Sequence, residues 1–437
     1  MNRHRWLLIL PVLALVLSGC GMRTVEDMYE IPRRSSEYQS FQTAMDSAMR
    51  DMEYAAPAAG ENRQSLQSED LDGDGMAEYL VFARDTSGKS LRILVFHEAD
   101  DNTFFLWDTI QATGTSFDQV VYAPVDDAPG VELIVGTQIS NQVMGNVAVY
   151  SFGEGSSEQI LSSSYSKLVA TDLDGDDRRE LLLIRQGEAE GNATAFSYDF
   201  KDGVFERSRD VTLSLRGDAV RRVVVGKLES GETAVYVSGQ TQEETVVTDV
   251  LTKLSQGLVN VAGSGDMGMG FQPLLNQSVY CEDLDGDGVL EFPTPVLGVG
   301  SGFGDTGSCL IDWYSVDSGG IGTWKYTTFH DYGDGWYVAL NDIWADRVTV
   351  SRERHSYTFS LRGEDGTAGT PLFSLYAFSG RDREAQAVDQ NRFLIFRGEN
   401  VVFAGKLESG STLNGVTQAF ITENFHLIHL ETSEKGR

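Results

Sequence analysis

The sequence predicts a mainly β fold: a β-propeller of about five blades, with seven as the alternative, preceded by one helix and followed by a small α+β domain. Two observations lead to this prediction. An acidic nine-residue loop occurs three times, and short apolar or aromatic segments separated by turns follow the first copy. The copies begin at Asp70, Asp172 and Asp283, which lie 102 and 111 residues apart. Half of this spacing is about 50 to 55 residues, close to the length of known propeller repeats.

Residues 1–20 are predicted to be an export signal. Arg3 and Arg5 precede an apolar run over 6–17 that is too short for a comfortable membrane span. The run ends in Leu17-Ser18-Gly19-Cys20, which resembles the bacterial lipobox. This resemblance implies that Cys20 is lipidated and becomes the first mature residue, the alternative being an ordinary cleaved signal with a chance cysteine. We therefore expect an extracytoplasmic protein that contacts the membrane through its lipid anchor only.

Residues 21–61 are expected to form a tether and an amphipathic helix. Ser36 and Gln39 fit a capping box at the start of a helix over about 37–54. Apolar residues follow at spacings of four, three and four, which places them on one helical face. These residues are Phe41, Met45, Ala48 and Met52. The stripe predicts a helix packed on the main body.

Residues 62–330 are expected to form the propeller. After the first acidic loop, strand-like segments occupy 78–83, 91–96 and 103–107. Four short strands per loop are the content of one blade. Degenerate loops lie midway between the acidic ones, at 124–135 and 226–237. The five units would begin near residues 66, 119, 167, 219 and 276, with metal sites in the first, third and fifth only.

Residues 331–437 contain no further acidic loop of this type and are interpreted as a separate α+β domain. Strand-like segments are followed by apolar residues that fit one helical face. The latter are Leu413, Val416, Phe420, Ile421 and Phe425. Two additional blades are the competing interpretation, because 405–410 repeats the six residues of 226–231.

The two cysteines after Cys20 are predicted to be free and buried. Cys281 would lie in the first strand of the fifth unit and Cys309 in the third. First and third strands of a meander are about 10 Å apart. A disulfide needs Cα atoms within about 7 Å, so this geometry excludes a bridge.

The acidic loops present carboxylates at positions 1, 3, 5 and 9, which is a pattern for a hard cation with oxygen ligands. An EF-hand would need a bidentate Glu at position 12, where this chain has Val81, Leu183 and Thr294. Glycine at position 6 suits a sharp bend, and Asp177 in the second copy is one of the few other residue types that tolerates it. The flexible all-oxygen set favours Ca²⁺ over Mg²⁺, and an acidic turn without an ion is the alternative.

The candidate ligands include the backbone carbonyl at position 7 of each loop. They are Asp70, Asp72, Asp74, Met76 and Glu78; Asp172, Asp174, Asp176, Arg178 and Glu180; and Asp283, Asp285, Asp287, Val289 and Glu291. Up to three structural Ca²⁺ ions are expected.

The loops resemble the calcium loops of FG-GAP and VCBS repeats, as in the propellers of integrin α-subunits. Together with the lipobox, the chain resembles bacterial VCBS-repeat lipoproteins. The resemblance covers about 62–330 and is specific over the loops only. It implies a β-propeller with Ca²⁺ bound through Asp70, Asp72, Asp74, Glu78 and their counterparts, and it implies no activity.

The net charge of −31 argues against nucleic acid as a partner, because phosphate binding needs clustered Lys and Arg. The pattern favours a lipid-anchored binding or scaffold module for a protein or glycan ligand. An extracellular enzyme acting on polysaccharide, a lyase or hydrolase, is the alternative, and a sensor or assembly lipoprotein of the envelope is a third possibility. No catalytic residue is assigned, because one sequence cannot show which acid and base groups converge.

Overall fold

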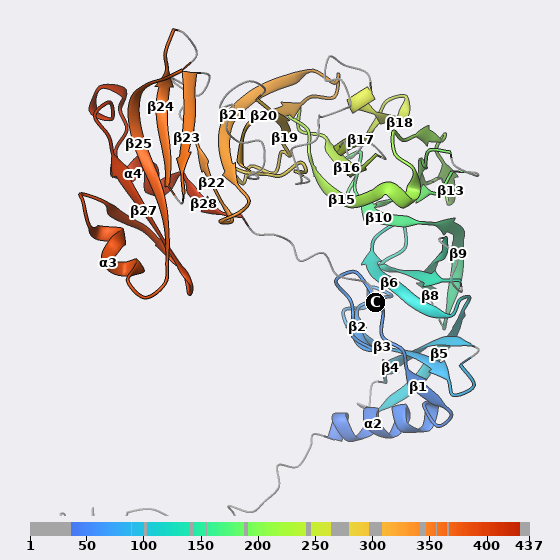
Figure 1. Cartoon of the computed structure of the whole chain (residues 1–437). Coiled ribbons are helices and arrows are strands. Elements are labelled where there is room, and N and C mark those ends of the chain that lie inside the picture. The colour runs from blue at the N-terminus through green and yellow to red at the C-terminus, as the bar shows by residue number, and fades with distance from the viewer. Residues whose placement is uncertain are drawn as a thin grey trace, which may run out of the picture.

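The computed structural model describes residues 36–88, 90–99, 103–139, 144–153, 155–187, 191–241, 246–263, 279–296, 308–340, 347–354, 356–364 and 367–428. The prediction of a mainly β chain is confirmed. The described strands form six antiparallel sheets that follow one another in chain order. Figure 1 shows that the sheets are arranged as an open arc and do not close into a ring.

The first three sheets are largely meanders, with β1 paired to β3 in the first sheet and β14 paired to β12 in the third as the departures from chain order. The first contains β1 (Met52–Tyr54), β2 (Leu66–Glu69), β3 (Glu78–Asp85), β4 (Leu91–Glu98) and β5 (Phe104–Ala112), with both β1 and β2 paired to β3. The second contains β6 (Ser116–Ala123), β7 (Glu132–Gln138), β8 (Gly145–Gly153) and β9 (Ser156–Tyr165). The third contains β10 (Lys167–Thr171), β11 (Glu180–Arg185), β12 (Thr194–Lys201), β13 (Val204–Arg207) and β14 (Val211–Thr212).

The last three sheets continue the arc. The fourth contains β15 (Val220–Lys227), β16 (Thr233–Gln240), β17 (Val246–Leu254) and β18 (Gly257–Asn260). The fifth contains β19 (Phe292–Pro295), β20 (Ser308–Val316), β21 (Gly322–Asp331), β22 (Trp336–Ala339) and β28 (Phe425–Leu427). The sixth contains β23 (Val348–Glu353), β24 (Ser356–Arg362), β25 (Ala368–Ser379), β26 (Phe393–Arg397) and β27 (Val401–Leu407).

The helices are short. They are α2 (Ser36–Ala48), α3 (Arg383–Val388) and α4 (Gln418–Glu423), with 3-10 turns at Gly217–Ala219, Val261–Gly263 and Thr412–Asn414. No helix of the described part is long and apolar enough to cross a membrane.

The sheets stack face to face, because the central strands bury both faces. On β11, Leu182 packs against the fourth sheet, whereas its neighbour Leu183 packs against the second. On β16, Val235 packs toward the third sheet and Tyr236 toward the fifth. Successive side chains of a strand point to opposite faces, so a continuous apolar run serves two neighbouring sheets. This is the packing expected of successive propeller blades.

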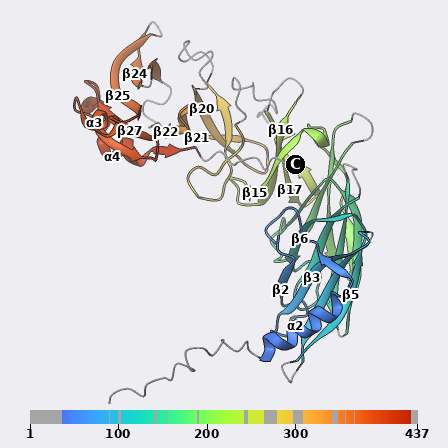
Figure 2. The ribbon, with the colours of Figure 1, turned by 60° about the horizontal axis from the view of Figure 1, so that its bottom comes forward.

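Helices cover the two outer faces of the stack. Phe41 and Met45 of α2 pack on Val81, Leu94 and Phe96, on the face of the first sheet opposite the second sheet. Figure 2 shows α2 lying along this end of the arc beside β5. At the other end, Ala387 of α3 packs on Val402 and Ala404 of the sixth sheet. A sheet face already covered by a helix cannot also pack on another sheet, so these helices explain why the ring is open.

Several expectations need correction. The N-terminal helix ends at Ala48 instead of near residue 54, because Met52–Tyr54 forms β1. The apolar C-terminal pattern is not one helix: it is divided among a 3-10 turn, α4 and β28, and Leu413 is 89% exposed. The residues 279–281 form no strand, and only Glu282 bridges to Glu291.

The segment after residue 330 is joined to the fifth unit. β22 pairs with β21, β28 pairs with β22, and the remaining strands form the sixth sheet.

The first four unit starts expected from sequence, near 66, 119, 167 and 219, agree with β2, β6, β10 and β15.

Candidate functional site: three acidic loops at the joints between sheets

The first acidic loop joins β2 to β3, the second joins β10 to β11 and the third precedes β19, and each is folded around its first aspartate. Asp70 Oδ1 accepts a hydrogen bond from the Gly73 amide at 2.8 Å, and Oδ2 accepts one from Gly75 at 3.0 Å. Asp172 and Asp283 accept the equivalent pairs of amides, at 2.6 and 3.1 Å and at 2.7 and 2.9 Å. The shared sequence pattern therefore produces one shared backbone conformation.

The loop conformation requires a left-handed residue at positions 4 and 6. The φ angle at position 6 is +88° at Gly75, +69° at Asp177 and +86° at Gly288. Asp is one of the few residues with a side chain that occupies this region at modest cost, since its short polar group can hydrogen-bond locally. The second loop thus keeps the bend despite lacking glycine there.

The glutamate at position 9 is the buried part of each loop. Glu78, Glu180 and Glu291 are 0%, 2% and 0% exposed. Each accepts a hydrogen bond from the backbone amide at position 2 of its own loop, at 2.9, 2.7 and 3.3 Å. Burial raises the pKa of all three carboxyls, and that of Glu291 to about 7. A carboxylate held in this way is costly unless a cation compensates it.

The carboxylates of each loop converge. In the first and third loops, the aspartates at positions 1, 3 and 5 each place one oxygen within 4.8 Å of the others. In the second loop, Asp172, Asp174 and Glu180 do so. At position 7, the amides of Met76, Arg178 and Val289 donate to the position-5 carboxylate at 2.7, 2.9 and 2.7 Å. The role of their carbonyls as metal ligands stays a prediction.

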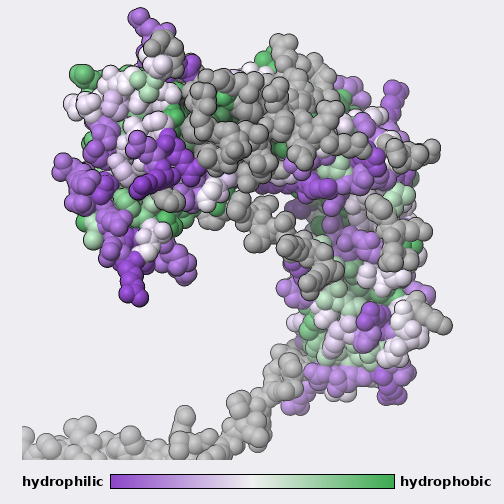
Figure 3. All heavy atoms as spheres, viewed as in Figure 1, coloured by the Kyte–Doolittle hydropathy of each residue, from purple (hydrophilic) through white to green (hydrophobic). Residues whose placement is uncertain are grey.

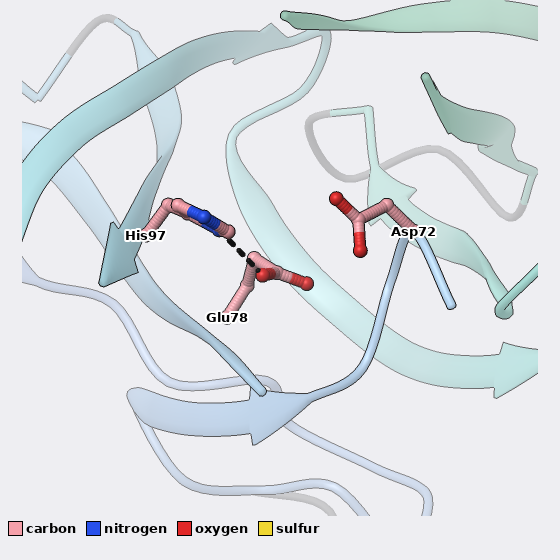
Figure 4. Close-up of side chains that lie close together, drawn as sticks. All are labelled: Asp72, Glu78 and His97. Atoms are coloured by element: carbon pink, nitrogen blue, oxygen red, sulfur yellow. Dashed lines mark hydrogen bonds and ion pairs between the residues drawn. The ribbon is translucent and has the colours of Figure 1, made fainter. Parts of the chain in front are cut away.

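The first loop includes a histidine that the sequence pattern did not reveal. Nδ1 of His97 on β4 lies 2.8 Å from Oε1 of Glu78, and with Asp72 these residues form a second cluster of possible ligands. Figure 4 shows the imidazole directed at Glu78, with Asp72 on the other side of this carboxylate. His97 also contacts the rings of Phe105 and Trp107. An imidazole nitrogen can therefore join the oxygen ligands at this loop.

The second loop holds side-chain cations. Nζ of Lys253 on β17 lies 2.5 Å from Asp174, 2.5 Å from Glu180 and 2.6 Å from Asp199. The Arg178 guanidinium lies 2.7 Å from Asp176 and also pairs with Asp127 of the second unit. This loop is thus electrostatically different from the other two.

The third loop contains a buried carboxylate oxygen without a well-aligned partner. Oε1 of Glu291 meets no described donor in good hydrogen-bond geometry, although the neighbouring Tyr326 hydroxyl lies close enough to lower the pKa of this carboxyl. Nearly all buried polar atoms in proteins are well paired, so this carboxylate oxygen beside three converging aspartates suits a bound cation. The donor set of the third loop therefore fits a divalent ion such as Ca²⁺.

The loops lie where neighbouring sheets meet. In the first loop, Gly73 lies against the backbone of Gly130 of the second unit. In the second, the Arg179 amide donates to the Pro124 carbonyl at 2.8 Å. In the third, the amide of Lys227 on the fourth sheet donates to the Gly288 carbonyl at 2.8 Å. A change in the conformation of a loop would therefore alter the backbone contacts that hold neighbouring sheets together.

The degenerate loops keep part of this construction. Glu132 of the second unit is 1% exposed and accepts the Val125 amide at 2.7 Å, as position 9 does in the acidic loops. The fourth unit has Ala234 at the equivalent position. The buried glutamate can therefore have a folding role without a complete ligand set.

A regular spacing could have identified the partners of position 9. His97, Ser151 and Asp199 follow Glu78, Glu132 and Glu180, respectively, by 19 residues, and each pair lies directly beyond the last residues paired between the second and third strands of its unit. In the fourth unit Lys253 follows Thr252, which lies opposite Ala234. The third strand of a unit thus supplies a polar side chain to the loop region.

A hollow of about 690 Å³ adjoins the second loop, between the third and fourth sheets. Its polar lining residues are Asp174, Lys201, Ser230, Glu232, Thr233, Lys253 and Ser255. On the face seen in Figure 3, hydrophilic and hydrophobic side chains are interspersed. The hollow is a mixed-charge surface suited to a polar ligand.

The cysteine prediction is confirmed for the one cysteine side chain that the structure describes. Cys281 is free and 3% exposed, while Cys20 and the side chain of Cys309 lie outside the described part.

No family model matches the chain, and no curated protein matches it. Among solved structures, the Aleuria aurantia lectin in complex with Fucalpha1-6GlcNAc is similar at 11% identity, covering 78% of this chain and 94% of that one, with a TM-score of 0.25. The Bacillus licheniformis rhamnogalacturonan lyase is 13% identical over 69% of this chain and 66% of its own, with a TM-score of 0.30. The Dos1 propeller is 10% identical over 80% and 88%, with a TM-score of 0.27.

Proposed function

We propose that this chain is an extracytoplasmic lipoprotein of the VCBS-repeat type, anchored through Cys20, whose propeller-like stack of sheets binds a protein or glycan ligand. In this proposal Ca²⁺ is structural: it fixes the acidic loops and thereby the joints between sheets. The loops are the main support, because three carboxylates of each loop place oxygens within 4.8 Å of one another at a contact between two units.

The third loop supports the metal assignment best. Asp283, Asp285 and Asp287 converge, and the free oxygen of Glu291 is buried beside them. Without a cation, four carboxylates in this space repel one another. A bound Ca²⁺ would stabilise the folded chain by about 3 kcal/mol at a hundredfold excess over its Kd.

The hollow between the third and fourth sheets is the proposed seat for the ligand. Its ammonium, carboxylate and hydroxyl groups can donate to and accept from sugar hydroxyls, which favours a glycan over an apolar ligand. Substituting Glu232 by Ala should weaken glycan binding measured on a glycan array. An unchanged binding profile would contradict this location.

The calcium proposal is tested by thermal unfolding of the full-length protein. EDTA should lower the melting temperature and excess Ca²⁺ should restore it. A variant with Asp283→Asn and Asp285→Asn should lose much of this response, while the control Asp126→Asn in the second unit should keep it. An unchanged melting curve in EDTA would refute the metal assignment.

The anchor is tested separately. Radiolabelled fatty acid should be incorporated into the wild-type protein expressed in a bacterial host, and the Cys20→Ala variant should remain unlabelled. Equal labelling of both proteins would exclude Cys20 as the acceptor.

A further inference from the structure

We propose that the ammonium group of Lys253 is the resident cation of the second acidic loop, so that this loop binds no divalent ion while the first and third loops do. This inference rests on the proposed calcium binding and reduces the expected ion count from three to two.

The geometry around Lys253 is that of an internal counter-ion. Nζ lies 2.5 Å from Asp174 at position 3, 2.5 Å from Glu180 at position 9 and 2.6 Å from Asp199 on β12. An ammonium group has three N–H donors, and here each has a carboxylate acceptor. The side chain is 11% exposed, so these charge-assisted bonds are largely shielded from water.

The side chain at position 7 of the second loop pairs with one more carboxylate of that loop. Arg178 donates to Asp176 at 2.7 Å and also pairs with Asp127, so the position-5 carboxylate is turned toward a guanidinium. The first loop has Met76 and the third has Val289 at this position. Of the four carboxylates at the ligand positions of the second loop, Asp172 is then the one that no described side-chain cation contacts. It accepts hydrogen bonds from two backbone amides.

The other two loops differ at the same place. Glu78 faces His97, whose imidazole can serve as a ligand, and Glu291 faces the Tyr326 hydroxyl but pairs with no described cation. In these loops an entering ion can use the position-9 oxygen without breaking a bond to lysine. In the second loop the ion would have to displace Lys253 from the two loop carboxylates, Asp174 and Glu180, and leave the largely buried ammonium with Asp199 alone.

The replacement of a divalent ion by Lys253 has a structural consequence. Lys253 belongs to the fourth sheet and its three partners to the third unit, so its ion pairs link the two sheets. The joint between the third and fourth sheets would therefore be independent of Ca²⁺. The joints at the first and third loops would respond to chelation.

The ion count decides the proposal. Full-length protein is freed of metal with EDTA, and bound Ca²⁺ is measured by equilibrium dialysis with radioactive calcium. We expect two ions in the wild type and three in Lys253→Met, which removes the charge but keeps most of the side-chain volume. Lys201→Met is the matched control, because Lys201 bonds Asp199 at 2.5 Å but no carboxylate of the loop, and it should bind two.

Asparagine variants assign each ion to a loop without depending on Lys253→Met. Asp172→Asn should leave the wild-type count at two, whereas Asp70→Asn and Asp283→Asn should each reduce it to one. A wild-type count of three, a lower count in Asp172→Asn, or two ions in a folded Lys253→Met would overturn this inference alone. A count of zero, or one unaffected by Asp70→Asn and Asp283→Asn, would instead overturn the proposed calcium binding.

Discussion

Glu132 offers a quantitative test of how the degenerate loops are built. This carboxyl is 1% exposed, and burial together with the nearby charge of Asp126 raises its pKa from 4.5 to about 7. Its hydrogen bond from Val125 can be kept by the amide oxygen of glutamine. Glu132→Gln therefore removes the buried charge and leaves the loop hydrogen bond in place.

The sign of the effect follows from proton linkage. Since the folded-state pKa is raised, the ionised carboxyl destabilises the fold above pH 7, and the penalty disappears as the pH falls toward 4.5. A difference of about 2.5 pKa units corresponds to about 3 kcal/mol. For a chain of 437 residues that unfolds cooperatively, this is a rise in melting temperature of roughly 3 °C.

The assay is thermal unfolding of wild type and Glu132→Gln at pH 8 and pH 4.5. The variant should melt at the higher temperature at pH 8, and the two proteins should converge at pH 4.5. Glu158→Gln on the exposed surface of β9 is the control and should change neither temperature. A variant that melts lower at pH 8, or by the same difference at both pH values, would refute the reasoning.

Two further predictions concern the ends and the core of the stack. His330 is 4% exposed, both of its ring nitrogens lack a partner among the described residues, and burial lowers its pKa from 6.5 to about 3. The wild-type protein therefore loses stability as the pH falls below 6.5, because the unfolded chain binds a proton that the buried ring does not. His330→Phe should raise the free energy of unfolding, measured by urea titration, by about 2 kcal/mol more at pH 5 than at pH 8. An equal gain at both pH values would contradict this. Phe41→Ala removes a ring that contacts Tyr79, Phe96 and Phe104 at centroid distances of 4.9, 5.6 and 5.3 Å, and it should cost about 3 to 5 kcal/mol of the docking of α2. Limited proteolysis of this variant should then cleave within α2 first, and size-exclusion chromatography should show that the variant self-associates. If α2 instead resists cleavage, the Phe41 ring does not hold this helix on the first sheet.

The helices that cover the two end sheets explain why the repeat spacing predicted where the units begin but did not predict that the ring of sheets stays open. Strand and turn signals are local, so the starts of β2, β6, β10 and β15 could be read from the sequence. Closure depends on whether the outer face of the first sheet meets another sheet. The stripe of Phe41 and Met45 predicted that α2 packs on the body, but its position on that face became known only from the contacts with Val81 and Leu94.

The acidic loops could be predicted from the sequence: their carboxylate spacing, the bend at position 6 and the glutamate that ends each one. These features lie within nine residues, where backbone geometry and side-chain type are sufficient. The groups that face the carboxylates, and the burial of the glutamates, follow from the tertiary structure. His97 comes from the third strand of the same sheet, and Lys253 reaches the second loop from the next sheet, 73 residues beyond Glu180. Charge compensation at a loop depends on groups brought there by strand pairing and sheet stacking, and this is why three similar sequences form electrostatically different sites.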